Sequence, residues 1–339
     1  MDLVRRRLDA LAKPVGSLGR LEQLAIWLAG VQGRCPPASL DRVAVVVFAG
    51  DHGITQLSHA PVSAYPRELT ATMVHAFLTG QAAVSVLAEA SGARVRVCDL
   101  GVDADLAAVP PDVTAYKVRR GSPPIDRRDA LTHSEVQDGL AAGCAIADDE
   151  IDAGTDLLIP GDMGIGNTTV AAAVTGAILD RSADEVVGAG TGIDAQTLAV
   201  KTATIDRALR RTRPYRADPT GLLRTGGSAD LAAMTGFLAR SAERETPVLL
   251  DGIVSGACAL LARQLAPGAQ DWWQAGHRST EPAHRLALAA LGLTPILDLQ
   301  MRLGEASGAL TALPVLRTAG RLLAGMPTLD ALTQLHPQP

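Results

Sequence analysis

A glycine-rich turn between an apolar run and an alanine-rich run is the clearest candidate for a chemical site. Residues 158–160 are apolar, and Gly161, Gly164 and Gly166 follow before the polar residues 167–168. Glycine permits positive φ and close approach of a ligand, and a polar residue can cap a helix whose free N–H groups bind anions. The pattern favours a phosphate cradle, although an ordinary strand-to-helix turn explains three glycines equally well.

Glu305 is the candidate for proton transfer. It falls between a strand-like run and a helix-like run of small residues, with apolar flanks. Such surroundings disfavour the charged form of a carboxylate and raise its pKa towards the range of a general base. A glutamate in the first turn of a helix, favoured by the helix dipole, accounts for the position equally well. Both interpretations stay open at this point.

Three further polar residues have simpler explanations. His52 follows an apolar run, but a metal site needs more ligands at suitable spacing, so a hydrogen-bonding histidine is favoured. Lys201 follows the turn at residues 188–192, where a surface lysine is the default and pairing with phosphate the alternative. Ser279 precedes Pro282 and can cap a helix there.

The elements that must position these residues alternate along the chain. Short β-branched runs alternate with longer helical patterns, which predicts an α/β fold with a doubly wound, Rossmann-like parallel sheet and helices on both faces. Most of the runs are continuously apolar, as strands buried on both faces are. The expected strands are residues 43–49, 95–100, 156–160, 248–251 and 295–299.

Glycine-bearing turns follow several of these runs. In open parallel sheets, ligands bind at the carboxyl ends of the strands. We therefore expect one cleft where the turns converge, and its polar groups come from residues 50–53, 161–166, 188–192 and 251–252.

Both ends of the chain are helix-like and lack strand patterns. We expect residues 1–40 and 306–339 to form a small helical subdomain, and residues 41–305 to form the α/β domain.

The composition limits the class of protein. At 339 residues and 47% hydrophobic content, the chain can bury a large core. A formal net charge of −5 and the lack of a basic run give no attraction to nucleic acid. The four cysteines are widely spaced, which suits a reducing cytoplasm, and no apolar stretch is expected to span a membrane. Neither a metal motif nor a cofactor motif is evident.

Eight motifs, taken together, resemble one family. It is the nicotinate-nucleotide:5,6-dimethylbenzimidazole phosphoribosyltransferase family of cobalamin nucleotide-loop synthesis. The motifs occur in order over nearly the whole chain: KPVGSLGRLE (13–22), FAGDHGI (48–54), PVSAYP (61–66), PGDMGIGNTT (160–169), GAGTG (188–192), LLDGIVSGACALLA (249–262), HRSTEPAH (277–284) and LDLQMRLGEASGA (297–309).

The resemblance implies a reaction. The 5-phosphoribosyl group of nicotinate mononucleotide passes to a benzimidazole nitrogen, which gives α-ribazole 5′-phosphate and nicotinate with inversion at the anomeric carbon. The pyridinium leaves as a neutral ring, so neither a general acid nor a metal is required. The partners implied are these small molecules and a second copy of the chain in a homodimer.

The resemblance also implies roles for particular residues. Glu305 would be the base that takes the benzimidazole proton. Ser63 and Leu303 would line the benzimidazole pocket, and Ser279 would contact the nicotinate end. The residues that would hold the phosphate and ribose are Asp162, Gly164, Gly166, Asn167 and Lys201. For Lys201, the resemblance therefore replaces the surface position that periodicity alone favours.

The chain departs from the family pattern at three places, of which Asp162 lies by the expected ribose and the other two lie near the expected base pocket. Asp162 stands where the family usually has glutamate, and Thr72 stands where it tends to have glutamine. Residues 57–59 resemble a short insertion. The acceptor base therefore stays open among benzimidazoles, purines and phenols. Two other functions stay open as well, a nicotinate mononucleotide glycosyl-bond hydrolase and a nucleotide-binding module without catalysis.

Overall fold

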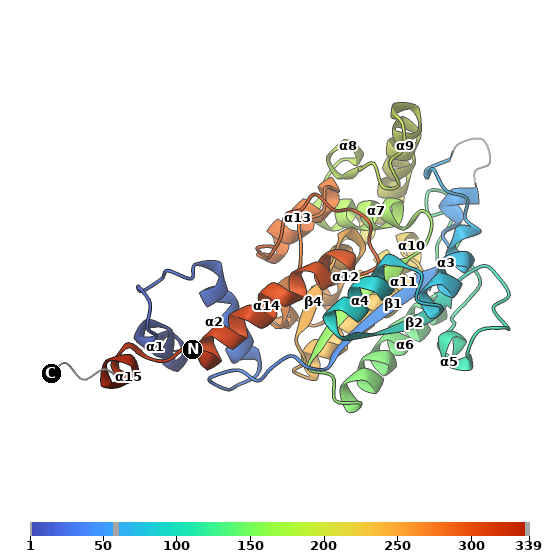
Figure 1. The fold of residues 1–339 in the computed structure, drawn as a ribbon. Helices are drawn as coiled ribbons and strands as arrows, with labels where there is room; N and C mark the ends of the chain where they lie inside the picture. The colour runs from blue at the N-terminus through green and yellow to red at the C-terminus, as the bar shows by residue number, and fades with distance from the viewer. Residues whose placement is uncertain (1, 57–60, 336–339) are drawn as a thin grey trace. The chain divides into compact units, whose positions relative to one another are not determined.

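A five-stranded parallel sheet organises the larger part of the chain (Figure 1). The computed structural model describes residues 2–56 and 61–335. The strand order is β2-β1-β3-β4-β5, and each neighbouring pair is parallel. The doubly wound α/β fold expected from the sequence is confirmed. The strands are β1 (Val43–Gly50), β2 (Ala93–Gly101), β3 (Leu157–Met163), β4 (Val248–Leu250) and β5 (Trp273–Ala275).

The expected strand at residues 295–299 was wrong. This run makes an isolated bridge, in which Leu297 pairs with His277. Pro295 has no N–H to donate to a ladder, and Leu299 is 58% exposed, so the run is a connection. The fifth strand is instead β5, which pairs with β4 and begins at the buried Trp273.

Helices connect the strands. The longer helices between residues 42 and 311 are α3 (Leu69–Leu78), α4 (Ala83–Ser91), α6 (His133–Asp152), α7 (Asn167–Leu179), α9 (Ala195–Thr212), α10 (Pro219–Gly226), α11 (Ala229–Glu243), α12 (Ile253–Leu265) and α13 (Pro282–Leu291). Shorter helical turns are η1 (Gly53–Gln56), α5 (Pro111–Thr114), α8 (Ala183–Val186), η2 (Arg213–Tyr215) and η3 (Ala269–Trp272).

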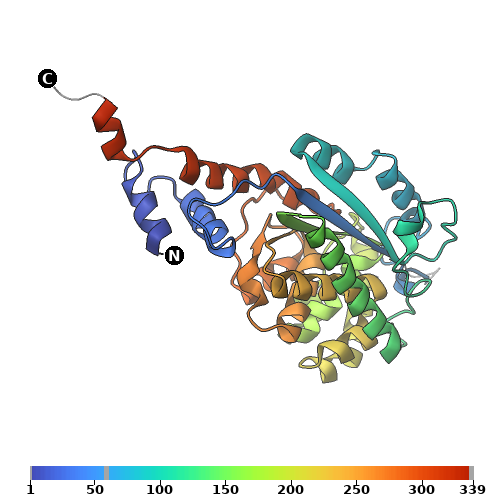
Figure 2. The ribbon, with the colours of Figure 1, turned by 90° about the horizontal axis from the view of Figure 1, so that it is seen from below.

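Both faces of the sheet are covered. On one face, α11 packs on β1 and β2, and the ring of Phe48 meets that of Phe237 edge-on with centroids 5.3 Å apart. Helix α3 contacts the same two strands, and α4 contacts β2. Figure 2 shows them on the opposite side of these strands from α6. Successive side chains of β1 are therefore buried in alternation against two helical layers.

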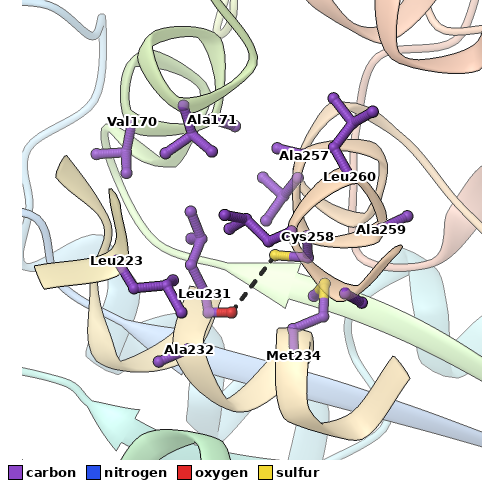
Figure 3. Close-up of a cluster of buried hydrophobic side chains, with 14 of the residues drawn as sticks. Val170, Ala171, Leu223, Leu231, Ala232, Met234, Ala257, Cys258, Ala259 and Leu260 are labelled. Atoms are coloured by element: carbon purple, nitrogen blue, oxygen red, sulfur yellow. Dashed lines mark hydrogen bonds between the residues drawn. The ribbon is translucent and has the colours of Figure 1, made fainter. Parts of the chain in front are cut away.

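Small residues let the helices of the core approach closely. Figure 3 shows alanines of α7, α11 and α12 packed around Leu231 and Cys258, whose Sγ lies 3.6 Å from the Leu231 carbonyl oxygen. Helices α6 and α11 meet through glycine on both sides. A Cβ at Gly143 would collide with the Ala233 carbonyl oxygen, and a Cβ at Gly236 would collide with that of Leu140. Backbone contact thus replaces large aromatic side chains in this core.

The chain divides into two compact units, residues 42–311 and a smaller unit of residues 1–41 with 312–339. The smaller unit contains α1 (Asp2–Ala10), α2 (Arg20–Val31), α15 (Leu329–Leu335) and the end of α14 (Ser307–Gly325). Its two chain segments are joined by hydrogen bonds, among them Ala12 N–H to the Pro327 carbonyl at 2.9 Å. Whether it folds as a separate domain stays a prediction.

One apolar segment passes a length-and-composition test for a membrane span, although none was expected from the sequence. Residues 69–91 are long and apolar enough, by length and composition alone, to cross a membrane. The structure breaks this segment between Leu78 and Ala83 into α3 and α4, of 10 and 9 residues. At 1.5 Å per residue, each helix is roughly half as long as a bilayer core is thick.

The contact between α6 and α11 gives a stability prediction. Gly143→Ala forces a methyl group into the backbone of α11, and we expect it to lower the free energy of unfolding by about 1–3 kcal/mol. Urea unfolding followed by circular dichroism measures this. Gly325→Ala is the matched control because this glycine also belongs to a helix but has no atom within 4 Å of the added Cβ. Equal stability of the two variants would contradict the close-packing account.

Candidate active site

A cavity lies at the carboxyl ends of the strands. The strand order reverses at β1, between β2 and β3, and ligands of doubly wound sheets bind at such a point. The cavity has a volume of about 680 Å³, which is within the range of small-molecule sites. Its polar lining includes Ser63, Gln81, Asp162, Asn167, Thr168, Thr191, His277, Ser279, Glu281, Arg302 and Glu305.

The glycine-rich turn forms one wall of the cavity. It leaves β3 and enters α7, which begins at Asn167, and Gly166 has a φ of 94° that favours glycine. A Cβ at Gly164 would collide with the Gly50 carbonyl oxygen, so the turn lies directly on the end of β1. Ile165 N–H donates to Thr70 Oγ1 at 3.2 Å. The first turn of α7 thus presents its N-terminus, where anions are favoured.

His52 packs against this turn. Its imidazole is buried, and a Cβ on Gly164 would come within 2.8 Å of Nε2. The same Nε2 lies 3.5 Å from Asp230 Oδ2. Neither ring nitrogen has a hydrogen-bond partner among the described residues, so the hydrogen-bonding role expected from the sequence stays a prediction. Within the described part of the chain, no group of three or more His, Cys, Asp or Glu is placed to hold a metal ion.

Lys201 lies behind the turn and does not line the cavity. Its side chain is fully buried in α9, and Nζ donates to Thr168 Oγ1 at 2.9 Å and to the Gly188 carbonyl at 3.0 Å. Burial lowers its pKa, and Glu281 opposes that effect. The surface position that periodicity alone favoured was wrong. The ammonium instead reaches the cavity through Thr168, which lines it.

The opposite wall comes from the segment after β5. Ser279 N–H donates to His284 Nδ1 at 3.0 Å, and burial together with the nearby His277 lowers the pKa of His284 to about 3. His284 is therefore neutral and fixes the Ser279 backbone. Glu281 accepts a hydrogen bond from Gly190 N–H at 2.8 Å and so joins this wall to the turn at residues 188–192.

Glu305 projects from a turn just before α14. Gly304, Glu305 and Ala306 have φ values of 85°, 60° and 63°, all in the left-handed region. The Glu305 side chain is buried, and its Oε2 has no hydrogen-bond partner. Strained backbone of this kind clusters at functional sites. The helix that follows begins two residues later, so Glu305 is not in its first turn.

Several buried carboxylates face one another here. Burial, together with the charge of Asp251, raises the pKa of Glu305 to about 7, although a hydrogen bond from Val84 N–H opposes the shift. Burial and the charges of Asp251 and Asp230 raise the pKa of Asp162 to about 8. Asn167 Nδ2 donates to Asp162 Oδ2 and partly offsets that shift. Both carboxyl groups therefore hold a proton to higher pH than a free carboxyl group does, Asp162 more strongly than Glu305.

The remaining wall is more apolar. Val62, Leu69 and Met73 line it together with Ser63, whose Oγ lies 3.3 Å from Thr191 Oγ1. Leu303 lines the cavity although its side chain is 57% exposed, which places it at the opening.

Eight of the nine site residues expected from the sequence line this one cavity, and Lys201 lies behind it. Thr72 is not among the lining residues. It is exposed on α3, between Leu69 and Met73, which do line the cavity. The insertion-like residues 57–59 lie outside the described residues.

Four charged or titratable residues at the cavity were not expected from the sequence. His277, Glu281 and Arg302 line the cavity, and each belongs to a motif already noted. Arg302 is the only lysine or arginine among the described cavity-lining residues, and it donates to the Gly190 carbonyl. Asp251 lies just behind the lining. All four belong to motifs that the sequence already marked as candidate sites. Which way each side chain points depends on the fold, so the sequence could not show which of them lie at the cavity.

Comparison with known proteins gives consistent matches. The family model described as Phosphoribosyltransferase (DBI_PRT) matches residues 1–332. A protein of Mycolicibacterium paratuberculosis named nicotinate-nucleotide–dimethylbenzimidazole phosphoribosyltransferase is 56% identical over 326 residues, which cover 96% of this chain and 91% of that one. The protein of the same name from Mycobacterium tuberculosis is 56% identical over 324 residues, which cover 96% and 88%.

A solved structure agrees with this result. The crystal structure of CobT from Thermus thermophilus matches with a TM-score of 0.91 and 43% identity, and the match covers 97% of each chain. Sequence and fold therefore agree over nearly the whole length, and the chain belongs to the nicotinate-nucleotide–dimethylbenzimidazole phosphoribosyltransferase family.

Proposed function

We propose that the protein transfers the 5-phosphoribosyl group of nicotinate mononucleotide to 5,6-dimethylbenzimidazole. The products are α-ribazole 5′-phosphate, which enters the cobalamin nucleotide loop, and nicotinate. The observation that carries the proposal is one cavity that joins a helix N-terminus suited to phosphate with a buried carboxylate, Glu305, whose Oε2 has no hydrogen-bond partner and whose pKa is about 7. The names of the relatives agree with it.

The glycine-rich turn and its surroundings bind the 5-phosphate. Gly164 and Gly166 let the phosphate approach the backbone at the start of α7, and Asn167 lines the same wall. Lys201 acts through Thr168, to which its ammonium donates a hydrogen bond, and so adds positive potential from behind. Asp162, neutral at pH 7, offers its carboxyl group to the ribose.

Glu305 serves as the general base. One benzimidazole nitrogen attacks the ribose anomeric carbon as the bond to the pyridinium nitrogen breaks, and the bonding electrons leave with nicotinate. The attacking ring becomes cationic, and Glu305 takes the proton from its other nitrogen. A base with a pKa near 7 is ionised often enough at neutral pH to act, and is still basic enough to hold the proton.

Different parts of the cavity lining suit the two aromatic rings. The apolar wall with Ser63 and Leu303 receives the benzimidazole, and Ser279, fixed by His284, meets the nicotinate. Arg302 adds a cation for the anionic substrate. Holding both rings on either side of the ribose makes the transfer effectively unimolecular, which supplies a large part of the acceleration.

The resemblance to the family extends the proposal to a homodimer in the cytoplasm. Mass measurement by light scattering tests the dimer, and a mass of about one 35.1 kDa chain would contradict it.

The reaction test uses purified protein with nicotinate mononucleotide, with and without 5,6-dimethylbenzimidazole, in buffer with EDTA. We expect α-ribazole phosphate and nicotinate in equal amounts, formed only when the base is present and unaffected by the chelator, because the leaving group is neutral. Chromatography with absorbance detection measures both products. Nicotinate released without any base would support the hydrolase, and no product with any of a panel of bases would support a binding module.

Replacing the base tests its role. Glu305→Gln keeps the shape but cannot accept a proton, and we expect turnover to fall by about 10² or more, with KM for nicotinate mononucleotide little changed. In the wild type, turnover should rise with pH through about 7 as Glu305 ionises, and this rise should be absent in the variant. Glu89→Gln, exposed on α4, is the control. Near-normal turnover of Glu305→Gln at pH 7 would rule out Glu305 as the required base.

The raised pKa of Asp162 gives a stability prediction. Its pKa is about 8 in the folded protein, against roughly 3.9 when unfolded. Between these pH values the folded state holds a proton that the unfolded state has released, so the free energy of unfolding falls as pH rises. We expect Asp162→Asn to raise that free energy at pH 8 by at least about 1 kcal/mol, and to change it little at pH 4.

Denaturant unfolding at both pH values measures the effect of Asp162→Asn. Asp184→Asn, at an exposed position on α8, is the control. A variant that loses stability at pH 8 would show that Asp162 is ionised and paired in the folded protein.

A further inference from the structure

The backbone that carries Glu305 is held in an unfavourable conformation. Gly304 adopts positive φ at no cost, but Glu305 and Ala306 have side chains and still have φ values of 60° and 63°. Two consecutive residues of this kind do not stay left-handed without outside constraints. The surroundings must therefore contain the groups that hold this turn.

One constraint is the surface of β3. The peptide between Glu305 and Ala306 lies flat on Gly161, where an added Cβ would come within 3.1 Å of the Ala306 nitrogen. This contact supports the turn from below, but it forms no directed bond. A second group has to fix the position of the chain along that surface.

Asp251 provides the directed bond. It follows β4, its side chain is 1% exposed, and Oδ1 accepts a hydrogen bond from Ala309 N–H at 2.9 Å. The N–H groups of Gly308 and Ala306 also hydrogen-bond to the carboxylate. These donors belong to the start of α14, where N–H groups lack partners within the helix and the dipole favours a negative charge.

We propose that Asp251 is a positioning residue for Glu305: its carboxylate anchors the start of α14, which fixes the left-handed turn, and its negative charge repels that of Glu305. The inference rests on the proposed function, because it concerns the base of that reaction. Asp251 itself does not line the cavity, whereas the next residue, Gly252, does.

The charge of Asp251 has a consequence for the pH dependence. The groups that act on Glu305 are Asp251 after β4, Asp162 on β3 and the Val84 N–H at the start of α4. His277, after β5, has Nε2 3.6 Å from Asp251 Oδ1 and lowers the pKa of Asp251. Removing the charge of Asp251 removes a repulsion, so Glu305 should ionise at lower pH.

Two substitutions distinguish the hydrogen bonds that Asp251 accepts from the start of α14 from the effect of its negative charge. Asp251→Asn keeps an oxygen that can accept from Ala309 N–H but has no charge, and Asp251→Ala removes both. We expect Asp251→Asn to retain most of the turnover, with the acid limb of the pH–rate profile moved to lower pH. We expect Asp251→Ala to lose roughly tenfold or more in turnover, with KM for nicotinate mononucleotide within about twofold of wild type.

A measurement that does not depend on catalysis tests the anchor separately. Hydrogen exchange followed by mass spectrometry should show faster exchange of the amides at residues 306–309 in Asp251→Ala and protection close to wild type in Asp251→Asn. Asp99→Asn is the matched control, since Asp99 is a buried carboxylate near the end of another strand, β2, and pairs with Lys117 at 2.7 Å. This control should lower stability but leave the acid limb in place.

The outcomes are distinct. Unchanged turnover or unchanged exchange in Asp251→Ala overturns the proposal. If Asp251→Ala does not fold, Asp251→Asn decides, and an acid limb at the wild-type pH overturns the proposal. Wild-type protein that makes no α-ribazole phosphate would refute the proposed function instead, while the exchange comparison would still test the anchor.

Discussion

Close approach of backbone to backbone at the carboxyl ends of the strands is the constraint on which the site depends. Gly164 lies so near the end of β1 that any side chain would collide with the Gly50 carbonyl, and Gly161 leaves just enough space for the peptide after Glu305. The glycine-rich turn and the turn that carries Glu305 thus both pack on the carboxyl ends of the strands. Their separation is set by the spacing of neighbouring strands, which is fixed by backbone hydrogen bonds.

Burial of carboxylates at this edge links catalysis to stability. Asp162, Asp251 and Glu305 are each nearly inaccessible, and burial raises the pKa of all three. Ionised groups in such positions lower the stability of the fold, and a left-handed residue other than glycine costs a further ~1–3 kcal/mol. The core of closely packed small residues, with α6 against α11, offsets this cost elsewhere in the same unit. Destabilising features are therefore concentrated around the cavity.

Much of this arrangement could be predicted from the sequence, for physical reasons. Short continuous apolar runs rich in β-branched residues, such as residues 43–49, are typical of buried strands, and glycine turns after parallel strands meet at the carboxyl ends of the sheet. The edge strand β5 was missed because three residues that begin with tryptophan carry little pattern. Lys201 and Asp251 could not be placed, since periodicity does not show which neighbouring element covers a helix face or receives a carboxylate. The shifted pKa values likewise depend on contacts between segments far apart in the chain.

The central claim is that one cavity holds the phosphate at the start of α7 and the proton acceptor at Glu305. A crystal structure of the protein with α-ribazole 5′-phosphate tests it most directly. We expect the phosphate to contact the backbone between Gly164 and Thr168. We also expect a benzimidazole nitrogen to lie within hydrogen-bond distance of the Glu305 carboxylate. A phosphate bound elsewhere, or a benzimidazole turned away from Glu305, would contradict it.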